Sequence, residues 1–459
     1  MTIYRATVID IAQDPFRSDD PAGAIRAEND GALLVRDGVI IARAPYATLR
    51  PQHPDEDVTE LTGGLLVPGF VDTHVHYPQV RAIAGLGMPL LDWLERCALP
   101  EEARLADVAY ARAVADELMT CLVGAGTTTA LVFGAHYASA MDAVFAAAER
   151  TGLRITSGLV VSDRILRGDL LTTPSRALAD GRVLVDRWHG RGKLRYAVTP
   201  RFSLSASEAM LDSCAELLGA ADGIYVTSHI NENGAEVDQV AGHFPARSHY
   251  LDTYHHHGLV GDRTVLAHNV HPTGHELEVM AEVGSWVAHC PTSNAALGSG
   301  LFPFRRHDAY GVGVALGSDV GAGTGFSLIK EGLQAYFAQQ LLGPDGLPLT
   351  PAHLLYLATR AGALALGLGD QIGDFEVGRR FDAVWLKPVP DSTLDIVLRH
   401  APDPSEALAK VFALATPADV AGVWVDGRRP TPAQLTRSTP AAPSHPSTTR
   451  SARTPEEAA

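Results

Sequence analysis

The sequence predicts an α/β protein: a (β/α)8 barrel of the TIM type, joined to a small β-sandwich-like domain that both chain ends build together. Three observations predict this fold. Eight short apolar runs alternate with longer amphipathic segments between residues 67 and 378. The segments on either side of this region return to short runs with turn signals, as in β structure. The composition, with 46% hydrophobic and 20% charged residues, is that of a globular protein.

The two ends of the chain carry the pattern of short strands. Residues 1–66 contain the β-rich runs "IYRATVID", "GALLVRDGVIIARAP" and "VTELTGGLLVPG", and Asp37-Gly38 is a strong hairpin signal. A second Asp-Gly turn, Asp426-Gly427, follows "VAGVWV". We therefore expect residues 1–66 and 379–430 to form one domain. Residues 431–459 are rich in Pro, Ser, Thr and Ala with almost nothing apolar to bury, so we expect a disordered tail.

The eight central runs are the expected barrel strands of a domain that spans residues 67–378. They lie at residues 69–75, 127–133, 154–161, 194–200, 224–230, 264–268, 285–289 and 313–319. Strands of a parallel barrel are buried on both faces, which explains why these runs are continuously apolar. The carboxyl ends of such strands form the active site, so polar residues there are the candidates for function.

Histidines and one aspartate close four of these runs. His74 and His76 end the first run in "VDTHVHYPQ", His229 ends the fifth, His268 the sixth, and Asp319 the eighth. Residues i and i+2 of a strand point to the same side, so the first two imidazoles can clasp one ion. A site made of three such imidazoles and one carboxylate suits Zn²⁺, or Fe²⁺ or Mn²⁺ where the cell supplies more of those metals. The sequence therefore predicts a metal site at this rim of the barrel.

Other polar residues near these ends have two interpretations each. Glu232, three residues after His229, can carry a proton between water and a substrate nitrogen, or can simply stabilise a helix N-terminus. His289 closes the seventh run, and we expect it to be structural. We expect residues 255–257, three consecutive histidines, on the solvated surface. The stretch "GAGTG" (321–325) lacks the Lys-Ser/Thr of a phosphate loop, so its glycines are expected to give a loop room.

Charge and cysteine usage exclude several classes of protein. The formal net charge is −16, from 37 basic and 53 acidic residues, which argues against a nucleic-acid partner. The first residues lack the layout of a signal peptide, and no apolar run is long enough to span a bilayer, so we expect no membrane association. The four cysteines lie far apart and form no CxxC pair, which predicts reduced thiols in a cytoplasmic protein.

Longer motifs resemble one known family. The pattern of HxH, two further histidines and an aspartate at strand ends resembles the amidohydrolase superfamily. The stretches "PGFVDTHVHYPQ" (68–79), "TPRFSLSAS" (199–207), "SHINEN" (228–233) and "LGSDVGAGTGFS" (316–327) resemble, more narrowly, the guanine deaminase family. The resemblance spans nearly all of residues 60–390. "CALPEEARL" keeps the family's proline and acids but lacks the usual aromatic residue before them.

The resemblance implies a reaction and a role for each site residue. One Zn²⁺ per chain would be held by His74, His76, His229 and Asp319. A metal-activated hydroxide would attack C2 of guanine, with Glu232, His268 and Asp319 as catalytic residues, and the products would be xanthine and ammonia. The purine base would be contacted by His76, Gln79, Arg201, Phe202, His229, Glu232 and Asp319. The family also implies a homodimer.

Two alternatives remain beside guanine deamination. A sibling enzyme would act on another purine, such as 8-oxoguanine, or on a triazine. Gln79 and Arg201 favour guanine, because the planar fork of an arginine matches a carbonyl oxygen. The second alternative is a non-catalytic barrel that serves as a scaffold, which we would expect to have lost ligands or the proton carrier.

Overall fold

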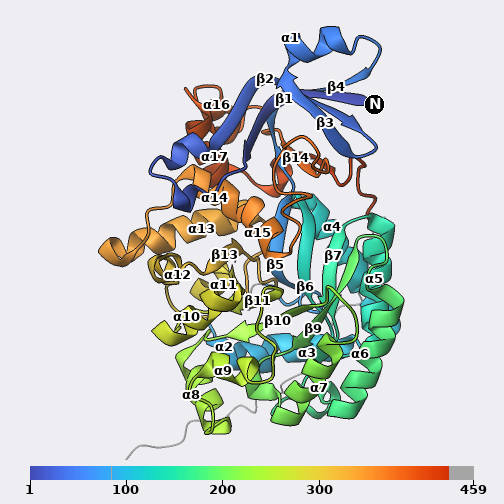
Figure 1. Ribbon diagram of the computed structural model, residues 1–459, viewed down its shortest axis with the longest axis vertical. Helices are drawn as coiled ribbons and strands as arrows, with labels where there is room; N and C mark the ends of the chain where they lie inside the picture. The colour runs from blue at the N-terminus through green and yellow to red at the C-terminus, as the bar shows by residue number, and fades with distance from the viewer. Residues whose placement is uncertain (84, 434–459) are drawn as a thin grey trace, which may run out of the picture.

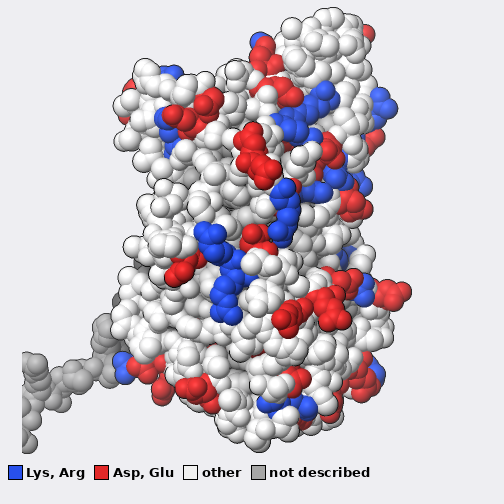
Figure 2. Space-filling view, turned by 60° about the vertical axis from the view of Figure 1, so that its left-hand side comes forward, with Lys and Arg blue, Asp and Glu red and all other residues white. Residues whose placement is uncertain are grey.

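The computed structural model describes residues 1–83 and 85–433 (Figure 1). The predicted disorder of residues 431–459 therefore falls almost entirely outside the described residues. Within those residues, no helix has both the length and the apolar character that crossing a membrane requires. Figure 2 shows acidic and basic side chains interspersed over one face of the molecule.

Eight parallel strands form the predicted barrel, in the order of the chain. They are β5 (Phe70–His76), β6 (Thr127–Phe133), β7 (Arg154–Gly158), β9 (Leu194–Pro200), β10 (Tyr225–Ile230), β11 (Thr264–His268), β12 (Trp286–His289) and β13 (Gly313–Leu316). The short β8 (Val160–Val161) pairs only with β9. The ring closes after β13, where Asp319 N donates to His74 O and His76 N donates to Val320 O, both at 2.8 Å. All eight predicted runs are thus confirmed as strands.

Helices cover the outside of the barrel (Figure 1). Those that follow the first five strands are α2 (Leu90–Trp93), α3 (Leu99–Arg104), α4 (Val108–Gly124), α5 (Ala138–Thr151), α6 (Pro174–Trp188), α7 (Glu208–Leu218), α8 (Gly234–His243) and α9 (Tyr250–His255). The later ones are α10 (Gly274–Val283), α11 (Pro291–Ala296), α12 (Phe304–Tyr310), α13 (Leu328–Leu341), α14 (Pro351–Ala358) and α15 (Arg360–Ala365). Several begin at a polar cap: the side chains of Asp107, Ser207 and Thr273 accept hydrogen bonds from the first turns of α4, α7 and α10.

Both chain ends build the small domain, as predicted. Its six strands form one mixed sheet in the order β15-β14-β4-β1-β2-β3. They are β1 (Thr2–Ile11), β2 (Ile25–Arg36), β3 (Val39–Pro45), β4 (Asp57–Pro68), β14 (Ala383–Leu386) and β15 (Val420–Trp424), and the domain also carries α1 (Tyr46–Leu49), α16 (Thr393–Leu398) and α17 (Pro404–Leu414). Asp37 and Gly38, at φ of 51° and 78°, make the predicted hairpin turn between β2 and β3. Two separate apolar clusters, one around Tyr4 and Phe381 and one around Ile3 and Leu34, form the domain's own core.

One glycine allows the last barrel strand to approach the first. A Cβ on Gly317 would lie only 2.8 Å from His74 Cβ and 3.0 Å from His74 N. Because this Cβ would press on both the backbone and the side chain of His74, a larger residue at position 317 would displace the strand that carries the HxH pair. The close approach brings Asp319 beside the histidines of β5.

Candidate active site

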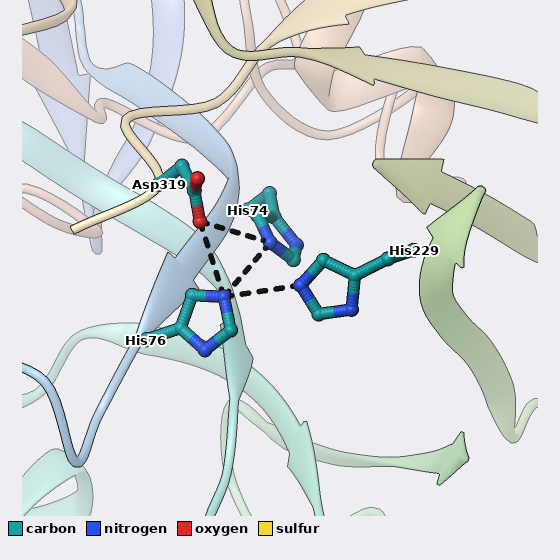
Figure 3. A group of neighbouring side chains, drawn as sticks. All are labelled: His74, His76, His229 and Asp319. Atoms are coloured by element: carbon teal, nitrogen blue, oxygen red, sulfur yellow. Dashed lines mark hydrogen bonds and ion pairs between the residues drawn. The ribbon is translucent and has the colours of Figure 1, made fainter. Parts of the chain in front are cut away.

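Four side chains converge at the carboxyl ends of the strands (Figure 3). His74 and His76 come from β5, His229 from β10, and Asp319 from the turn after β13. Each offers one ligand atom, all these atoms lie within 4.8 Å of one another, and all four residues are buried. His76 Nε2 is 3.1 Å from His74 Nε2, 3.3 Å from His229 Nε2 and 3.1 Å from Asp319 Oδ1. The predicted ligands therefore share one centre.

The spacing and charge of this group fit a divalent ion. A tetrahedral ion about 2.0–2.1 Å from each nitrogen holds its ligand atoms about 3.3–3.4 Å apart, close to the spacing around His76. Burial lowers the pKa of His76 to about 4 and that of His229 well below its usual range, so these imidazoles are neutral. Burial raises the pKa of Asp319, but hydrogen bonds with His74 and His76 outweigh it and keep the pKa well below its usual range. Neutral imidazoles and an ionised carboxylate are the forms that bind metals.

Hydrogen bonds to groups outside the four ligands orient the rings of His229 and His268. His229 Nδ1 donates to the backbone oxygen of Arg201 at 2.6 Å, which leaves Nε2 with its lone pair toward the centre. His268 Nδ1 donates in the same way to Asn294 Oδ1 at 3.0 Å. Its Nε2 then lies 3.8 Å from Asp319 Oδ2 and 3.5 Å from Glu232 Oε2. His268 thus bridges the predicted ligand group and the predicted proton carrier.

The backbone is unusual at two of these residues. His268 has a φ of 74° and Asp319 a φ of 47°, in the left-handed region that non-glycine residues seldom adopt. Both residues stand where a strand has just ended and the chain must turn. Such conformations persist only where the surroundings enforce them, and they concentrate at functional sites.

Glu232 faces the cavity instead of capping a helix. Asn233 and Glu236 form the capping box at the start of α8, so the helix N-terminus is satisfied without Glu232. Burial, with repulsion from Glu236 and Asp319, raises the pKa of Glu232 well above its usual range. This raised pKa favours the protonated form of the carboxyl group, the form that can donate a proton.

A small cavity opens beside Glu232 and the ligand group. Its polar wall contains Gln79 and Arg201, and Phe202 lies next to them. Its remaining walls are largely apolar and come from Leu90, Trp93, Leu94, Leu297 and Ala322. A flat heterocycle with polar edges suits such a mixture of apolar walls and a few fixed polar groups.

The sequence did not indicate every residue of this site. Glu102, buried in α3, binds both Gln79 and Arg201, and Asn294 holds His268. "LPEEARL" has the pattern of an exposed acidic helix, and only the tertiary packing turns Glu102 inward. Asn294 lies in "CPTSN", which carries no metal or acid–base signal of its own.

The remaining histidines lie outside the ligand group. His289 is buried, with its ring stacked 4.2 Å from that of Phe302, as expected of a structural residue. His255 and His256 are exposed as predicted. The prediction is wrong for His257, whose ring is only 4% exposed and lies between the carboxylates of Glu208 and Asp212.

The glycines of residues 321–325 are expected to give a loop room, and Gly323 does so at a tight turn. Gly323 N donates to Asp319 O at 2.6 Å, and a Cβ on Gly323 would lie 1.8 Å from Ser318 O. Gly321 N donates to Gln79 Oε1 at 3.2 Å. The turn therefore ties the aspartate of the ligand group to the polar wall of the cavity.

Comparisons with known proteins agree on one family. The model of the amidohydrolase family matches residues 65–429. The probable guanine deaminase of Deinococcus radiodurans is 59% identical over 432 residues, which are 93% of this chain and 98% of that protein. Among solved structures, E. coli guanine deaminase has a TM-score of 0.90 at 35% identity, covering 95% of this chain and all (100%) of the other. The guanine deaminase of C. acetobutylicum, solved with bound guanine in its active site, has a TM-score of 0.85 at 25% identity, covering 94% of this chain and 100% of the other.

Proposed function

The chain belongs to the amidohydrolase family and, within it, to the guanine deaminases, and on this premise we propose that it hydrolyses guanine to xanthine and ammonia with one Zn²⁺ per chain. The observation that carries the proposal is the convergence of the four ligand residues beside Glu232 and the cavity. The test is ammonia release from guanine by metal-loaded protein. Adenine, cytosine, 8-oxoguanine and a triazine serve as comparison substrates.

Zinc is supported by the chemistry of the ligands. His74, His76, His229 and Asp319 present three nitrogens and one carboxylate oxygen, which Zn²⁺ favours and which Fe²⁺ and Mn²⁺ also accept. When bound, such an ion supplies a Lewis acid that makes water nucleophilic near neutral pH. We propose that this chemistry is used for attack on C2 of guanine, the carbon that bears the exocyclic amine.

Three residues then manage the protons. Asp319, the ionised carboxylate, accepts the proton of the attacking water. Glu232, protonated in its buried site, donates its proton to the ring nitrogen next to C2. It then takes the proton of the new C2 hydroxyl, as that oxygen becomes a carbonyl, and delivers it to the departing amine. Asp319 finally passes the proton of the attacking water to Glu232, which restores both groups. His268 lies between the two carboxyl groups, where it orients the water and steadies the developing charge. Guanine and water thus yield xanthine and ammonia, with every proton accounted for.

The polar wall would recognise the purine. We propose that Gln79 and Arg201 bind the polar edge of guanine, with Phe202 against the base. His76, His229, Glu232 and Asp319 also border the cavity and would lie against the reacting part of the ring. The guanine bound in the C. acetobutylicum relative supports this use of the cavity.

Replacing Arg201 should impair binding of guanine far more than turnover. We expect Arg201→Ala to raise KM for guanine about 10–100-fold, because hydrogen bonds from a charged group contribute about 1.5–3 kcal/mol. Arg201→Lys keeps the charge but loses the planar fork of the guanidinium, so its KM for guanine should lie between those of Arg201→Ala and the wild type. Steady-state kinetics on guanine measure both. Unchanged kinetics for Arg201→Ala would remove this residue from the recognition of the base.

The substrate panel separates the alternatives. Ammonia from 8-oxoguanine or a triazine, but not from guanine, would replace the proposal with a sibling aminohydrolase. Failure to act on any of these compounds, with metal bound, would favour a non-catalytic scaffold. The buried acid Glu232 beside the ligand group supports an enzyme over a scaffold.

We also propose a cytoplasmic homodimer. The four cysteines are all free thiols, as expected in a reducing compartment. Phe337 and Leu341 lie one turn apart on α13 and are 47% and 75% exposed, an apolar surface that a second copy could cover. Sedimentation equilibrium should give twice the chain mass of 48.7 kDa. A mass equal to one chain would reject the dimer.

A further inference from the structure

A buried carboxylate lies behind the polar wall of the cavity. Glu102 is 3% exposed and does not itself line the cavity. Its Oε1 accepts hydrogen bonds from Gln79 Nε2 and from Arg201 Nη2, each at 2.8 Å. Its Oε2 lies 3.4 Å from Arg201 Nε and 3.2 Å from His136 Nε2. One carboxylate thus engages both side chains proposed to bind the purine.

The four residues come from distant segments. Glu102 lies in α3, Gln79 follows β5, His136 follows β6, and Arg201 follows β9. The segment just before α3, Leu94–Ala98, is a π-helical turn, a rare form that is frequent at functional sites. Leu94 of that turn lines the cavity. The same short segment therefore provides an apolar wall and the anchor behind the polar wall.

We propose that Glu102 is a positioning residue for substrate recognition, which fixes Gln79 and Arg201 in one arrangement and balances the charge of Arg201, so that the cavity prefers neutral guanine to the anionic form of xanthine. The inference rests on the proposed function. It adds to that function a reason why the product leaves.

The hydrogen bonds determine how each recognition group is presented. The Nε and Nη2 groups of Arg201 donate hydrogen bonds to Glu102. The guanidinium edge that carries Nη1 therefore points away from this carboxylate. Glu102 also accepts a hydrogen bond from Gln79 Nε2, while Gln79 Oε1 accepts one from Gly321 N. A flipped Gln79 amide would place its oxygen against a carboxylate. Donors and acceptors are therefore fixed before the ligand arrives, which lowers the cost of binding.

The charge of Glu102 has a separate effect. Burial raises its pKa, but Arg201 and then His136 outweigh burial and hold the pKa well below its usual range, so Glu102 is ionised. The titratable groups that face it are Arg201, His136 and, farther off, Tyr137. A buried guanidinium without such a partner would attract anions. Xanthine, with an N–H between two carbonyls, is a stronger acid than guanine, so an unbalanced Arg201 would retain the product.

The test is Glu102→Gln in the zinc-loaded protein. We expect KM for guanine to rise about tenfold or more, with kcat changed by less than about threefold, because the lost interaction serves binding and not the chemical step. The inhibition constant for xanthine relative to KM for guanine should fall about tenfold at mildly alkaline pH, where xanthine is partly anionic. A merely structural role would not produce this shift toward the product. An unchanged ratio would overturn the charge argument.

A double-mutant cycle tests the route of action. If Glu102 acts through Arg201 as well as Gln79, then Glu102→Gln should raise KM less in an Arg201→Ala background than in the wild type, and the effect that remains should come from Gln79. Additive effects would overturn the inference. The control is Glu101→Gln in the same helix, since Glu101 pairs with Arg104 and Tyr110 instead of the recognition residues. It should leave KM and xanthine inhibition unchanged.

A shorter acid covers the case in which Glu102→Gln does not fold. Glu102→Asp keeps the charge but withdraws it from Gln79 and Arg201, so KM should rise while the preference for guanine over xanthine remains. An unchanged KM for Glu102→Asp would reject the positioning role. Equilibrium binding keeps the two proposals apart: if neither purine binds the wild type, the proposed function fails, whereas binding that Glu102→Gln does not alter rejects only the role of Glu102.

Discussion

We expect Glu232→Gln to retain its metal and to lose about 10³-fold in kcat on guanine, within the range of about 10²–10⁴ that a positioned proton donor contributes. The amide has nearly the shape of the acid but cannot donate and recover a proton. Glu232 is not one of the four ligand residues, so metal content should stay at one ion per chain. Steady-state kinetics and elemental analysis on the same preparation measure both quantities.

The matched control is Glu278→Gln in α10. Glu278 is 63% exposed and belongs neither to the ligand group nor to the cavity lining, so its substitution should leave kcat and metal content at the wild-type values. A fully active Glu232→Gln would show that another group carries the proton. Loss of metal from this variant would instead place Glu232 among the ligands.

The parts of the fold that local sequence determines were predictable. Each barrel strand is a continuous apolar run because both of its faces are buried, and that pattern is visible in four to seven residues. His74 and His76 could be placed on one side because alternation along a strand is strict. Strand ends of a barrel meet at one rim, so His229 and Asp319 could be assigned to the same site without any contact being known.

The residues that escaped prediction depend on tertiary packing. Glu102 differs from its neighbour Glu101 only in the face of α3 on which it lies, and nothing in "LPEEARL" shows which face is covered. His257 follows two exposed histidines, yet contacts with α7 bury its ring. Such contacts join segments dozens of residues apart, where periodicity carries no information.

Barrel and ligands together leave the substrate undecided, because one fold hosts many reactions. On the roles proposed above, Gln79 and Arg201, positioned by the carboxylate of Glu102, would select among purines and triazines. This is why variants of Arg201 and Glu102 should alter KM and product inhibition, whereas Glu232→Gln should alter kcat. The two groups of residues are adjacent in space but should be separable in kinetics.

Removing the metal should abolish activity, and restoring it should bring activity back. We expect chelation to lower ammonia release from guanine at least about 10³-fold, since Lewis-acid activation contributes several kcal/mol, and Zn²⁺ to restore it. His229→Ala should lower ammonia release in the same way, but added Zn²⁺ should not restore it, because this variant lacks one of the four ligands. An ion present at about 100 times its Kd also stabilises the fold by about 2.7 kcal/mol, so the melting temperature should fall on chelation.

A second histidine at a strand end provides the decisive comparison. His289 closes β12 as His229 closes β10, and both are buried, but only His229 belongs to the ligand group. His289→Ala should therefore lower stability, through the cavity it leaves against Phe302, while one equivalent of zinc remains bound. If His289→Ala lost the metal, or if guanine turnover survived complete removal of metal from the wild type, the assignment of the centre to His74, His76, His229 and Asp319 would be wrong. Both histidines are buried at the end of a strand. If only His229→Ala loses the metal, the loss of activity in that variant is due to metal coordination and not to the loss of a buried side chain.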